Sequence, residues 1–350
     1  MSTGAIVQLG RHWIDRARGL YLACAAVGSG SFVRRFGAYT AMPSTSAASR
    51  ACFVTGADAG YFWLASAAIQ SLDEQCPGVD VRVLDFGVTP AQADFLRSRH
   101  LLLERPAEVP AGLHPYELKT CFGRYVRALP HENIVWLDGD VLCVGDAAGA
   151  VNALFRQMER NGSQIAVCPD MGPNPTLGRF ASSFPAPALA SFIGSAPGRG
   201  GMRYLNTGVI AFRGARGFFA QWERMAARMP GETCIDQNAF NILVHGNPDA
   251  ALVLDPAVWN VHSSLLGRAR LDGTGCRCEG SATRAVFLHC TSYRLEFIDE
   301  YRVQLRVAGL EIDTVVKSFR DATMRRHHLE LLKRFVKAHA AALKDCGVAS

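Results

Sequence analysis

Two acidic residues separated by one glycine directly follow a strongly apolar run. Asp138 and Asp140 flank Gly139, after the apolar residues 134–137. Such a run predicts a buried strand, and open α/β sheets bind their ligands at the C-terminal ends of strands. Two carboxylates at this spacing can hold one hard divalent cation, whose other positions suit phosphate oxygens. The alternative is the tight turn of a β-hairpin, which Asp-Gly between apolar residues also favours.

Several further motifs follow one another between residues 51 and 295. They are Phe53-Val54-Thr55-Gly56-Ala57-Asp58 with Gly60-Tyr61, Ser71-Leu72, Tyr204-Leu205-Asn206-Thr207-Gly208-Val209, Asp236-Gln237-Asn238-Ala239-Phe240-Asn241, Trp259-Asn260 and Leu288-His289. With the Asp-x-Asp segment, this series resembles the GT-A fold nucleotide-sugar glycosyltransferases, and among them the retaining glycosyltransferase family 8 group. The resemblance implies transfer of a hexose from a nucleotide diphosphate sugar, favouring a UDP-sugar, to an acceptor hydroxyl with retention of configuration.

The resemblance also implies a metal site. Asp138, Asp140 and His289 would bind Mn²⁺ or Mg²⁺, and an imidazole nitrogen suits Mn²⁺ better than Mg²⁺. A histidine that ends an apolar strand is, taken alone, more often a core residue. Its place in the motif series favours the ligand interpretation, and Gly139 would belong to the same nucleotide-sugar site.

Thr55 and Asp58 lie at the end of the first expected strand, where the resemblance implies nucleotide binding. A carboxylate there can accept hydrogen bonds from a uracil or a ribose. Asp58 could instead cap the helix that begins near Tyr61.

Four polar residues are candidates for the catalytic centre. Asn206 resembles the family residue that hydrogen-bonds the donor sugar, although Asn-Thr-Gly is also turn chemistry. Asp236 and Gln237 match an Asp-Gln pair at a helix start, where the carboxylate would bind sugar hydroxyls and the amide would lie beneath the anomeric carbon. Asp236 could also be only a helix cap. Asp170, after the strand at 165–168, would meet acceptor or donor hydroxyls, although Asp-Met-Gly-Pro-Asn-Pro is also turn chemistry.

A cationic side chain is needed near the diphosphate, because the leaving nucleoside diphosphate gains negative charge in the transition state. Lys119 and Arg124 are the candidates before the Asp-x-Asp strand, and the spacing does not decide between them. The family's His-x-x-Gly-x-x-Lys-Pro-Trp run is missing. Arg294 would replace the lysine of that run, which contacts phosphate.

The elements that must position these residues alternate between strands and helices. Strands are expected at 51–55, 79–86, 134–137, 165–168, 208–212, 252–254 and 285–289, and helices at 60–72, 90–99 and 116–129. This alternation predicts an α/β fold of the GT-A (Rossmann-like) type, with a mainly parallel sheet and helices on both faces. Residues 172–201 are too long for an ordinary connection and are expected to form an acceptor-binding lid.

Charge divides the chain into three parts. Residues 1–50 carry +5, residues 51–301 carry −4 and residues 302–350 carry +5. We expect a flexible basic leader and linker at 1–50, the GT-A domain at 51–300 and a basic helical extension at 301–350. The extension's apolar residues, such as Leu332 and Val336, fall at helical spacing; they would pack on the domain or, alternatively, lie on anionic lipid.

The composition excludes several classes of protein. A mildly acidic body argues against a nucleic-acid groove, and the motifs of phosphate-loop ATPases, dinucleotide-binding dehydrogenases and serine hydrolases are missing. No apolar run reaches the length of a membrane-spanning helix. Eleven scattered cysteines predict reduced, buried thiols and a cytoplasmic chain, with peripheral membrane contact through the basic ends as an option.

Two other functions stay open from sequence. One is an inverting GT-A transferase, in which Asp236 or Asp170 would serve as the general base. The other is a non-catalytic GT-A-like scaffold that binds a partner or a membrane. The acceptor could be a carbohydrate, a lipid-linked or a protein hydroxyl.

Overall fold

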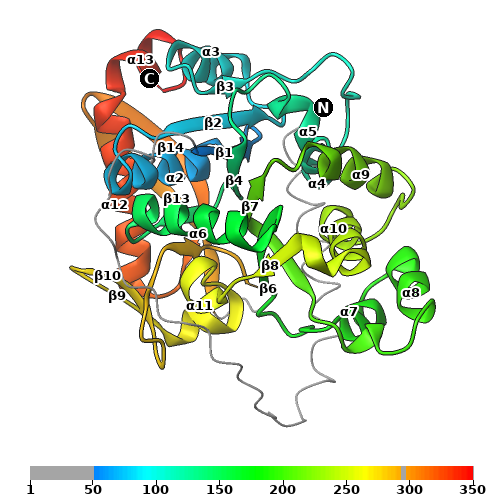
Figure 1. Ribbon diagram of the computed structural model, residues 1–350. Helices are drawn as coiled ribbons and strands as arrows, with labels where there is room; N and C mark the ends of the chain where they lie inside the picture. Colours follow the sequence, from blue (N-terminus) through cyan, green and yellow to red (C-terminus); the bar gives the residue numbers. More distant parts are fainter. Residues whose placement is uncertain (1–50, 293–296, 350) are drawn as a thin grey trace. The chain divides into compact units, whose positions relative to one another are not determined.

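The computed structural model describes residues 51–292 and 297–349, and Figure 1 shows how their elements are arranged. The predicted leader at 1–50 and the predicted phosphate contact Arg294 lie outside the described residues. One compact unit, Ala38–Ser350, contains all of the described chain, so residues 301–350 belong to the same unit as residues 51–300.

A seven-stranded sheet in the order β3-β2-β1-β4-β7-β6-β8 forms the centre of this unit. Its strands are β1 (Ala51–Ala57), β2 (Asp80–Asp85), β3 (Leu102–Leu103), β4 (Asn133–Leu137), β6 (Ile165–Pro169), β7 (Leu205–Arg213) and β8 (Ala251–Val253). All neighbouring pairs are parallel except those of β7, which is antiparallel to β4 and β6. The predicted mainly parallel α/β sheet is therefore confirmed.

Both faces of the sheet are buried, because alternate side chains of each strand enter two different hydrophobic clusters. On β4, Val135 and Leu137 join one cluster, and Ile134 and Trp136 join the other. Helices on the first side are α2 (Phe62–Gln75), α3 (Pro90–Ser98) and α6 (Ala147–Asn161); those on the second are α4 (Pro115–Thr120), α5 (Phe122–Val126), α9 (Arg216–Ala226) and α10 (Ile235–Gly246). Packing on both faces holds the strands in place, and with them the polar residues that follow the strand ends.

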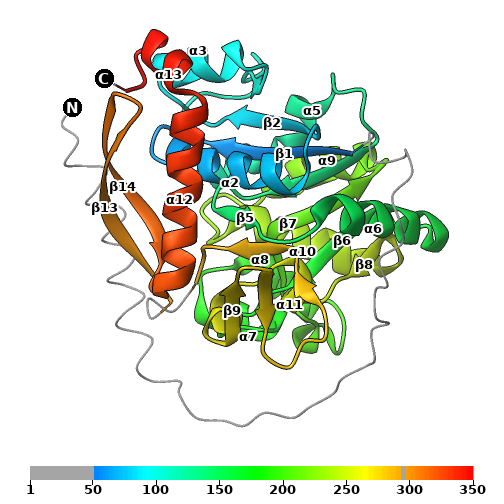
Figure 2. The same ribbon diagram turned by 90° about the vertical axis from the view of Figure 1, so that its left-hand side faces the viewer.

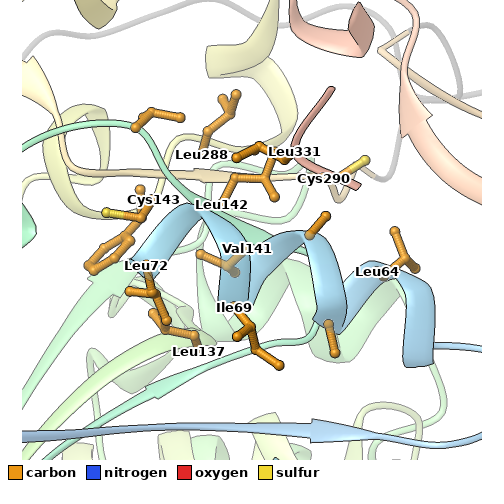
Figure 3. Close-up of a cluster of buried hydrophobic side chains, with 14 of the residues drawn as sticks. Leu64, Ile69, Leu72, Leu137, Val141, Leu142, Cys143, Leu288, Cys290 and Leu331 are labelled. Carbon is orange, nitrogen blue, oxygen red and sulfur yellow. The ribbon is translucent and has the colours of Figure 1, made fainter. Parts of the chain in front are cut away.

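The Asp-x-Asp segment is not the turn of a hairpin. Strand β4 ends at Leu137, and the next strand, β5 (Val141–Cys143), pairs with β12 (Phe287–His289) and not with β4. In Figure 3, Leu64, Ile69 and Leu72 of α2 lie in one apolar cluster with Val141 and Leu142 of β5. The segment thus connects the central sheet to a second, small sheet.

Two expected elements differ from the structure. The helix expected at 116–129 is divided into α4 and α5, which meet at Cys121. The expected lid at 172–201 is not a long loop, because it contains α7 (Leu177–Ser183), α8 (Pro187–Gly194) and a short 3-10 helix, Arg199–Gly201. These helices pack on the second hydrophobic cluster through side chains such as Phe180 and Leu189.

Three short strands near β12 form a small antiparallel sheet in the order β11-β10-β9. They are β9 (Ala269–Asp272), β10 (Gly275–Cys278) and β11 (Arg284–Ala285), and the helix α11 (Pro256–Trp259) precedes them in the chain. The segment from α11 to β12 carries Asn260 and His289 to the same edge of the molecule as the Asp-x-Asp segment.

The expectation of an entirely helical C-terminal extension is wrong for its first half. Residues 298–319 form the hairpin of β13 (Ile298–Val307) and β14 (Leu310–Phe319), followed by α12 (Ala322–Ala338) and α13 (Ala340–Asp345). Ala308 and Gly309 at the turn have φ of 52° and 79°, as the favoured hairpin turns require. Figure 2 shows this hairpin beside α12.

The apolar face of α12 packs on its own domain. Of the two alternatives predicted from sequence, packing on the domain and lying on anionic lipid, the structure has the first. Leu331, Leu332, Phe335 and Val336 are buried in the first hydrophobic cluster, and α12 lies along α2. This apolar face is therefore not available to a lipid surface while the helix is packed.

A buried histidine on α12 predicts acid sensitivity of this packing. Burial lowers the pKa of His328 to about 4, and its Nδ1 lies 2.9 Å from the Ser318 hydroxyl of β14. The nearest charged groups include Asp140, His327 and Lys317. Since the folded pKa lies below the unfolded value, the stabilisation is complete above pH ~6.5 and is lost as the pH falls towards 4, by about 3 kcal/mol.

Urea unfolding between pH 7 and pH 4 measures this effect. The free energy of unfolding should depend less on pH in the His328→Asn variant, by the uptake of one proton. The control variant His100→Asn, at an exposed position, should keep the wild-type pH dependence. Equal slopes in wild type and His328→Asn would contradict the assignment of this proton to His328.

All ten cysteines in the described part of the chain are free thiols, and eight of them are buried. Burial raises the pKa of thiols such as Cys52, to about 12. Among the described helices, none has both the length and the apolar character needed to cross a membrane.

Candidate metal and nucleotide-sugar site

The predicted polar residues come together because their elements end at one edge of the central sheet. Asp138 follows β4 and Asp170 follows β6, whereas Asn206 lies at the start of the antiparallel strand β7, which is the same edge. Asp236 and Gln237 occupy the first turn of α10, and His289 ends β12. Reversal of β7 is thus what places Asn206 beside the other residues.

Asp138, Asp140 and His289 form a cluster whose candidate ligand atoms all lie within 4.8 Å of one another. His289 Nε2 is 3.1 Å from Asp140 Oδ1 and 3.9 Å from Asp138 Oδ2. The other oxygen of Asp138 accepts hydrogen bonds from Trp136 Nε1 at 2.8 Å and from Lys119 Nζ at 2.7 Å. Asp138 Oδ2 is therefore the oxygen that faces the histidine.

A chain of amide hydrogen bonds determines which nitrogen of His289 carries the proton. The backbone N–H of Gly208 donates to Asn206 Oδ1 at 2.9 Å, which fixes the orientation of that amide. Asn260 Nδ2 donates to the same oxygen at 2.8 Å, so Asn260 Oδ1 must face His289 Nδ1, which lies 3.0 Å away. We infer that Nδ1 carries the proton and that Nε2 is unprotonated in the neutral ring.

This tautomer fits a bound cation. Two carboxylate oxygens and an unprotonated imidazole nitrogen face one another, and all three are electron-pair donors without a proton between them. A divalent ion satisfies such a set, and an orienting hydrogen bond on the far nitrogen is typical of histidine ligands. Burial alone would raise the pKa of Asp140, but the ammonium of Lys317 holds it well below its usual range.

Position 208 has room only for glycine, because the His289 ring occupies the space that a side chain would need. A Cβ at this position would lie 2.2 Å from His289 Cε1 and 2.9 Å from Asn206 Oδ1. Gly139 is similarly constrained, since its Cβ would meet the carbonyl oxygen of Gly56 at 2.9 Å. Both glycines therefore let the backbone pass close to the cluster.

Of the two candidate cations, Lys119 lies at the site and Arg124 does not. Lys119 is buried, with Nζ 2.7 Å from Asp138, 3.4 Å from Asp236 and 3.1 Å from the Thr207 hydroxyl. Burial alone would lower the pKa of Lys119, but the two carboxylates raise it above its ordinary value.

Arg124 lies on α5, beyond the break at Cys121, and contacts neither of those carboxylates. Its guanidinium pairs with Glu223 of α9 at 2.5 Å and donates to the carbonyl of Glu108. The prediction of Arg124 as a nucleotide-sugar contact is therefore not supported, because the break directs it to another surface.

Asp236 is not the helix cap that the sequence left open. Cys234 occupies the N-cap of α10, and the Asp236 carboxylate accepts a hydrogen bond from Thr207 Oγ1 at 3.0 Å besides its pair with Lys119. Burial raises the pKa of Asp236 despite the nearby lysine.

Gln237, Asn206 and Asp170 form a second buried group beside the first. The backbone N–H of Thr207 donates to Gln237 Oε1 at 3.2 Å, so its Nε2 faces Asp170 Oδ2, 3.5 Å away. Asn206 Nδ2 donates to the same oxygen at 3.0 Å, and the N–H of Gly172 donates to Asp170 Oδ1. Burial raises the pKa of Asp170.

Thr55 and Asp58 lie at the end of β1, as predicted. One oxygen of Asp58 accepts hydrogen bonds from the backbone N–H groups of Gly60 and Tyr61 at 2.9 and 2.8 Å, in the turn before α2. Tyr61 is the N-cap of α2, so Asp58 is not the cap of that helix. Thr55 is buried, and its hydroxyl is without a hydrogen-bond partner in the described structure.

Three contributors to the site were not predicted from sequence. Lys317 of β14 pairs with Asp140, Thr207 connects Lys119 with Asp236, and His262 stacks on His289 with ring centroids 5.8 Å apart. Thr207 and Asn260 belong to the motif series, but the resemblance assigns no role to either. These contacts join segments that lie far apart in the sequence, so residue spacing gives no signal of them.

Comparison with solved structures finds glycosyltransferases. The chain is similar to the apo form of the bifunctional glycosyltransferase WbbM, with 14% identity and a TM-score of 0.48 over 71% of this chain and 47% of WbbM. It is similar to galactosyltransferase LgtC in complex with donor and acceptor sugar analogues, with 16% identity and a TM-score of 0.47 over 83% and 99%. It also resembles apo mouse xyloside xylosyltransferase 1, with 16% identity and a TM-score of 0.43 over 69% and 96%.

The three proteins named are glycosyltransferases, the class of enzyme that the sequence motifs resemble. The chain spans about half the length of WbbM. No family model and no curated protein matches the sequence. With identities of 14–16%, the function of this chain has to be inferred from the side chains of its own site.

The amide chain leads to a prediction for Asn260. Replacing it with alanine removes the acceptor that fixes the His289 tautomer, and we expect the Kd for Mn²⁺ to rise about 10- to 100-fold. Calorimetric titration with Mn²⁺ measures this change, with the exposed Asn247→Ala variant as control. An unchanged Kd in the folded Asn260→Ala protein would show that the tautomer does not depend on this amide.

Proposed function

We propose that the chain is a metal-dependent glycosyltransferase that moves a hexose from a nucleotide diphosphate sugar, in the first place a UDP-sugar, to an acceptor hydroxyl. The main support is the convergence of Asp138, Asp140 and the unprotonated Nε2 of His289 beside a buried lysine. A set of electron-pair donors next to a fixed cation suits a metal-bound diphosphate.

The residues of the site divide into two roles under this proposal. Asp138, Asp140 and His289 would hold Mn²⁺ or Mg²⁺, and the bound ion would neutralise charge on the leaving diphosphate. Lys119 holds Asp138 and Asp236 in place and adds positive charge at the same position. Gly139, Thr55 and Asp58 would line the nucleotide end of the donor.

The second role is recognition of the sugar by the buried group next to Lys119. Asp170, Asn206 and Gln237 present carboxylate and amide atoms, and Asp236 lies one residue before Gln237. Such groups bind sugar hydroxyls and reject analogues that leave them unpaired. We assign these four residues to the donor sugar and to the reacting carbon.

Retention of configuration is part of the proposal and comes from the resemblance to family 8. NMR analysis of the anomeric configuration of the product tests it. An inverted product would instead assign Asp236 or Asp170 as general base, a role that their raised pKa values suit.

Nucleotide release without an acceptor tests the proposed reaction class. Wild-type protein is incubated with a panel of UDP-sugars in the presence of Mn²⁺ or EDTA, and released UDP is measured. We expect slow release from one donor with Mn²⁺ and none with EDTA. Absence of release from every donor, together with absence of metal-dependent UDP binding, would favour the non-catalytic scaffold.

We also propose a cytoplasmic location, since the described cysteines are free thiols. Peripheral membrane contact would have to use exposed basic residues such as Lys337 and Lys344, because the apolar face of α12 is buried. Flotation with anionic liposomes tests this contact. Unchanged flotation of a Lys337→Glu, Lys344→Glu double variant would exclude these residues from it.

A further inference from the structure

A lysine from the C-terminal hairpin reaches the candidate metal cluster. Lys317 lies on β14, and its Nζ is 2.5 Å from Asp140 Oδ2. The same ammonium group is 3.3 Å from the Tyr61 hydroxyl and lies over the Tyr61 ring, 5.4 Å from its centroid. The motif series contains no residue from this part of the chain.

The two oxygens of Asp140 therefore have different partners. Oδ1 faces His289 Nε2 at 3.1 Å, and Oδ2 pairs with the ammonium of Lys317. Asp140 is buried, with only 5% of its side chain exposed, so its negative charge depends on the ammonium of Lys317. Lys317 is the nearest full positive charge to the oxygen that a divalent ion would also attract.

The hairpin fixes the backbone of Lys317 beside the cluster. Its neighbours on β14, Val316 and Ser318, are buried on the other face of the strand, and Ser318 is hydrogen-bonded to His328 of α12. Lys317 itself is 23% exposed at the side chain. Its long stem can therefore swing while the backbone stays fixed, which distinguishes it from the buried Lys119.

We propose that Lys317 is a counter-ion that neutralises Asp140 until metal and nucleotide bind. Its ammonium then leaves Asp140 and pairs with a phosphate oxygen of the diphosphate. This inference rests on the proposed function: its first half needs the proposed metal site, and its second half also needs the nucleotide. An ammonium carries three donors on a flexible four-carbon stem, so it can exchange a carboxylate for a phosphate oxygen without moving the backbone. Tyr61 contacts this ammonium through its ring and its hydroxyl, so it can keep the group near the cluster during the exchange.

The two halves of the proposal predict opposite changes when the charge is removed. Without Lys317, the oxygens of Asp140 have no resident cation to displace, so Mn²⁺ alone should bind more tightly. The nucleotide would at the same time lose an ammonium partner, so UDP should bind less tightly to the metal-loaded protein. A residue that only supports the fold would weaken both.

The experiment compares Lys317→Met with wild type in two calorimetric titrations. For Mn²⁺ without nucleotide, we expect the Kd to fall about tenfold; for UDP at saturating Mn²⁺, we expect the Kd to rise about tenfold. Lys317→Arg, which keeps the charge, should stay near wild type in both titrations. Lys333→Met is the matched control, because Lys333 pairs with Glu330 on the surface of α12.

An unchanged or weaker Mn²⁺ affinity in Lys317→Met would overturn the counter-ion role. An unchanged UDP affinity would overturn the transfer to the diphosphate. If Lys317→Met does not fold, as circular dichroism would show, Lys317→Gln provides the same neutral substitution with a polar end. The metal titration needs no turnover, so it decides the first half even if no donor sugar is ever hydrolysed.

Discussion

Asp140→Asn is expected to lower metal-dependent UDP release by at least about a hundredfold. The substitution keeps the shape of the side chain but removes one of the two carboxylates of the cluster, and with it the charge that a divalent ion needs. It also leaves His289 Nε2 with only Asp138 Oδ2, 3.9 Å away, as an anionic neighbour. Loss of a preorganised charge in a buried site costs several kcal/mol of transition-state stabilisation.

UDP release and Mn²⁺ titration of the same preparation measure this prediction. Asp299→Asn is the matched control, because Asp299 pairs with Arg320 at an exposed position of the hairpin. Should Asp140→Asn retain metal-dependent release within tenfold of wild type, the Asp-x-Asp segment would not be the metal site.

Lys119→Met is expected to have the second largest effect, and it acts on folding as well as on turnover. The substitution leaves Asp236 buried without its cation and removes a 2.7 Å bond from Asp138. Breaking a buried pair from one side costs about 3 kcal/mol or more, because the remaining charge stays desolvated. UDP release should fall by at least about a hundredfold in whatever fraction folds.

Arg124→Met is the matched control for this experiment. It removes an ion pair with Glu223 in which both side chains are partly exposed, so the free energy of unfolding should change by about 1 kcal/mol or less. Urea unfolding and UDP release of the two variants show which of the two residues, Lys119 or Arg124, is the cation near the diphosphate. Equal losses in both would mean that Lys119 has no special role.

The central part of the site could be predicted because it lies in short, ordered segments. The apolar runs before Asp138 and before Asp170 predict strands, and strand ends of a parallel sheet lie at one edge. Asn206 lies at the start of β7, and in a parallel sheet the start of a strand lies at the edge opposite to the strand ends. The same reasoning therefore places Asn206 away from Asp138 and Asp170. Only the structure shows that β7 is reversed, which brings Asn206 to within 3.0 Å of Asp170.

The choice between Lys119 and Arg124 could not be made from spacing. A continuous helix would carry both residues, but the chain breaks at Cys121 and turns Arg124 towards Glu223. Gly123 follows the break by two residues but lies within α5, so it does not mark where α4 ends. Packing of α4 and α5 against α9 and α10 decides it.

The hairpin that carries Lys317 has a local signal in the sequence. Val303 and Leu305 on β13 and Ile312 and Val316 on β14 are buried at even spacings, and Gly309 lies at the turn between the strands. That spacing indicates strands, whereas the helical spacing used for the extension applies only after Ala322. The contact of Lys317 with Asp140 is a tertiary contact that no local pattern contains.

The packing of α12 on α2 also has a consequence for synthesis of the protein. Arg334 of α12 pairs with Glu74 of α2 across 260 positions of the sequence. At about 5–20 residues per second, the nascent chain must keep the apolar face of α2 out of aggregates for many seconds before α12 leaves the ribosome. Chains that end prematurely before Ala322 would never cover that face, so they should be clients of chaperones and proteases.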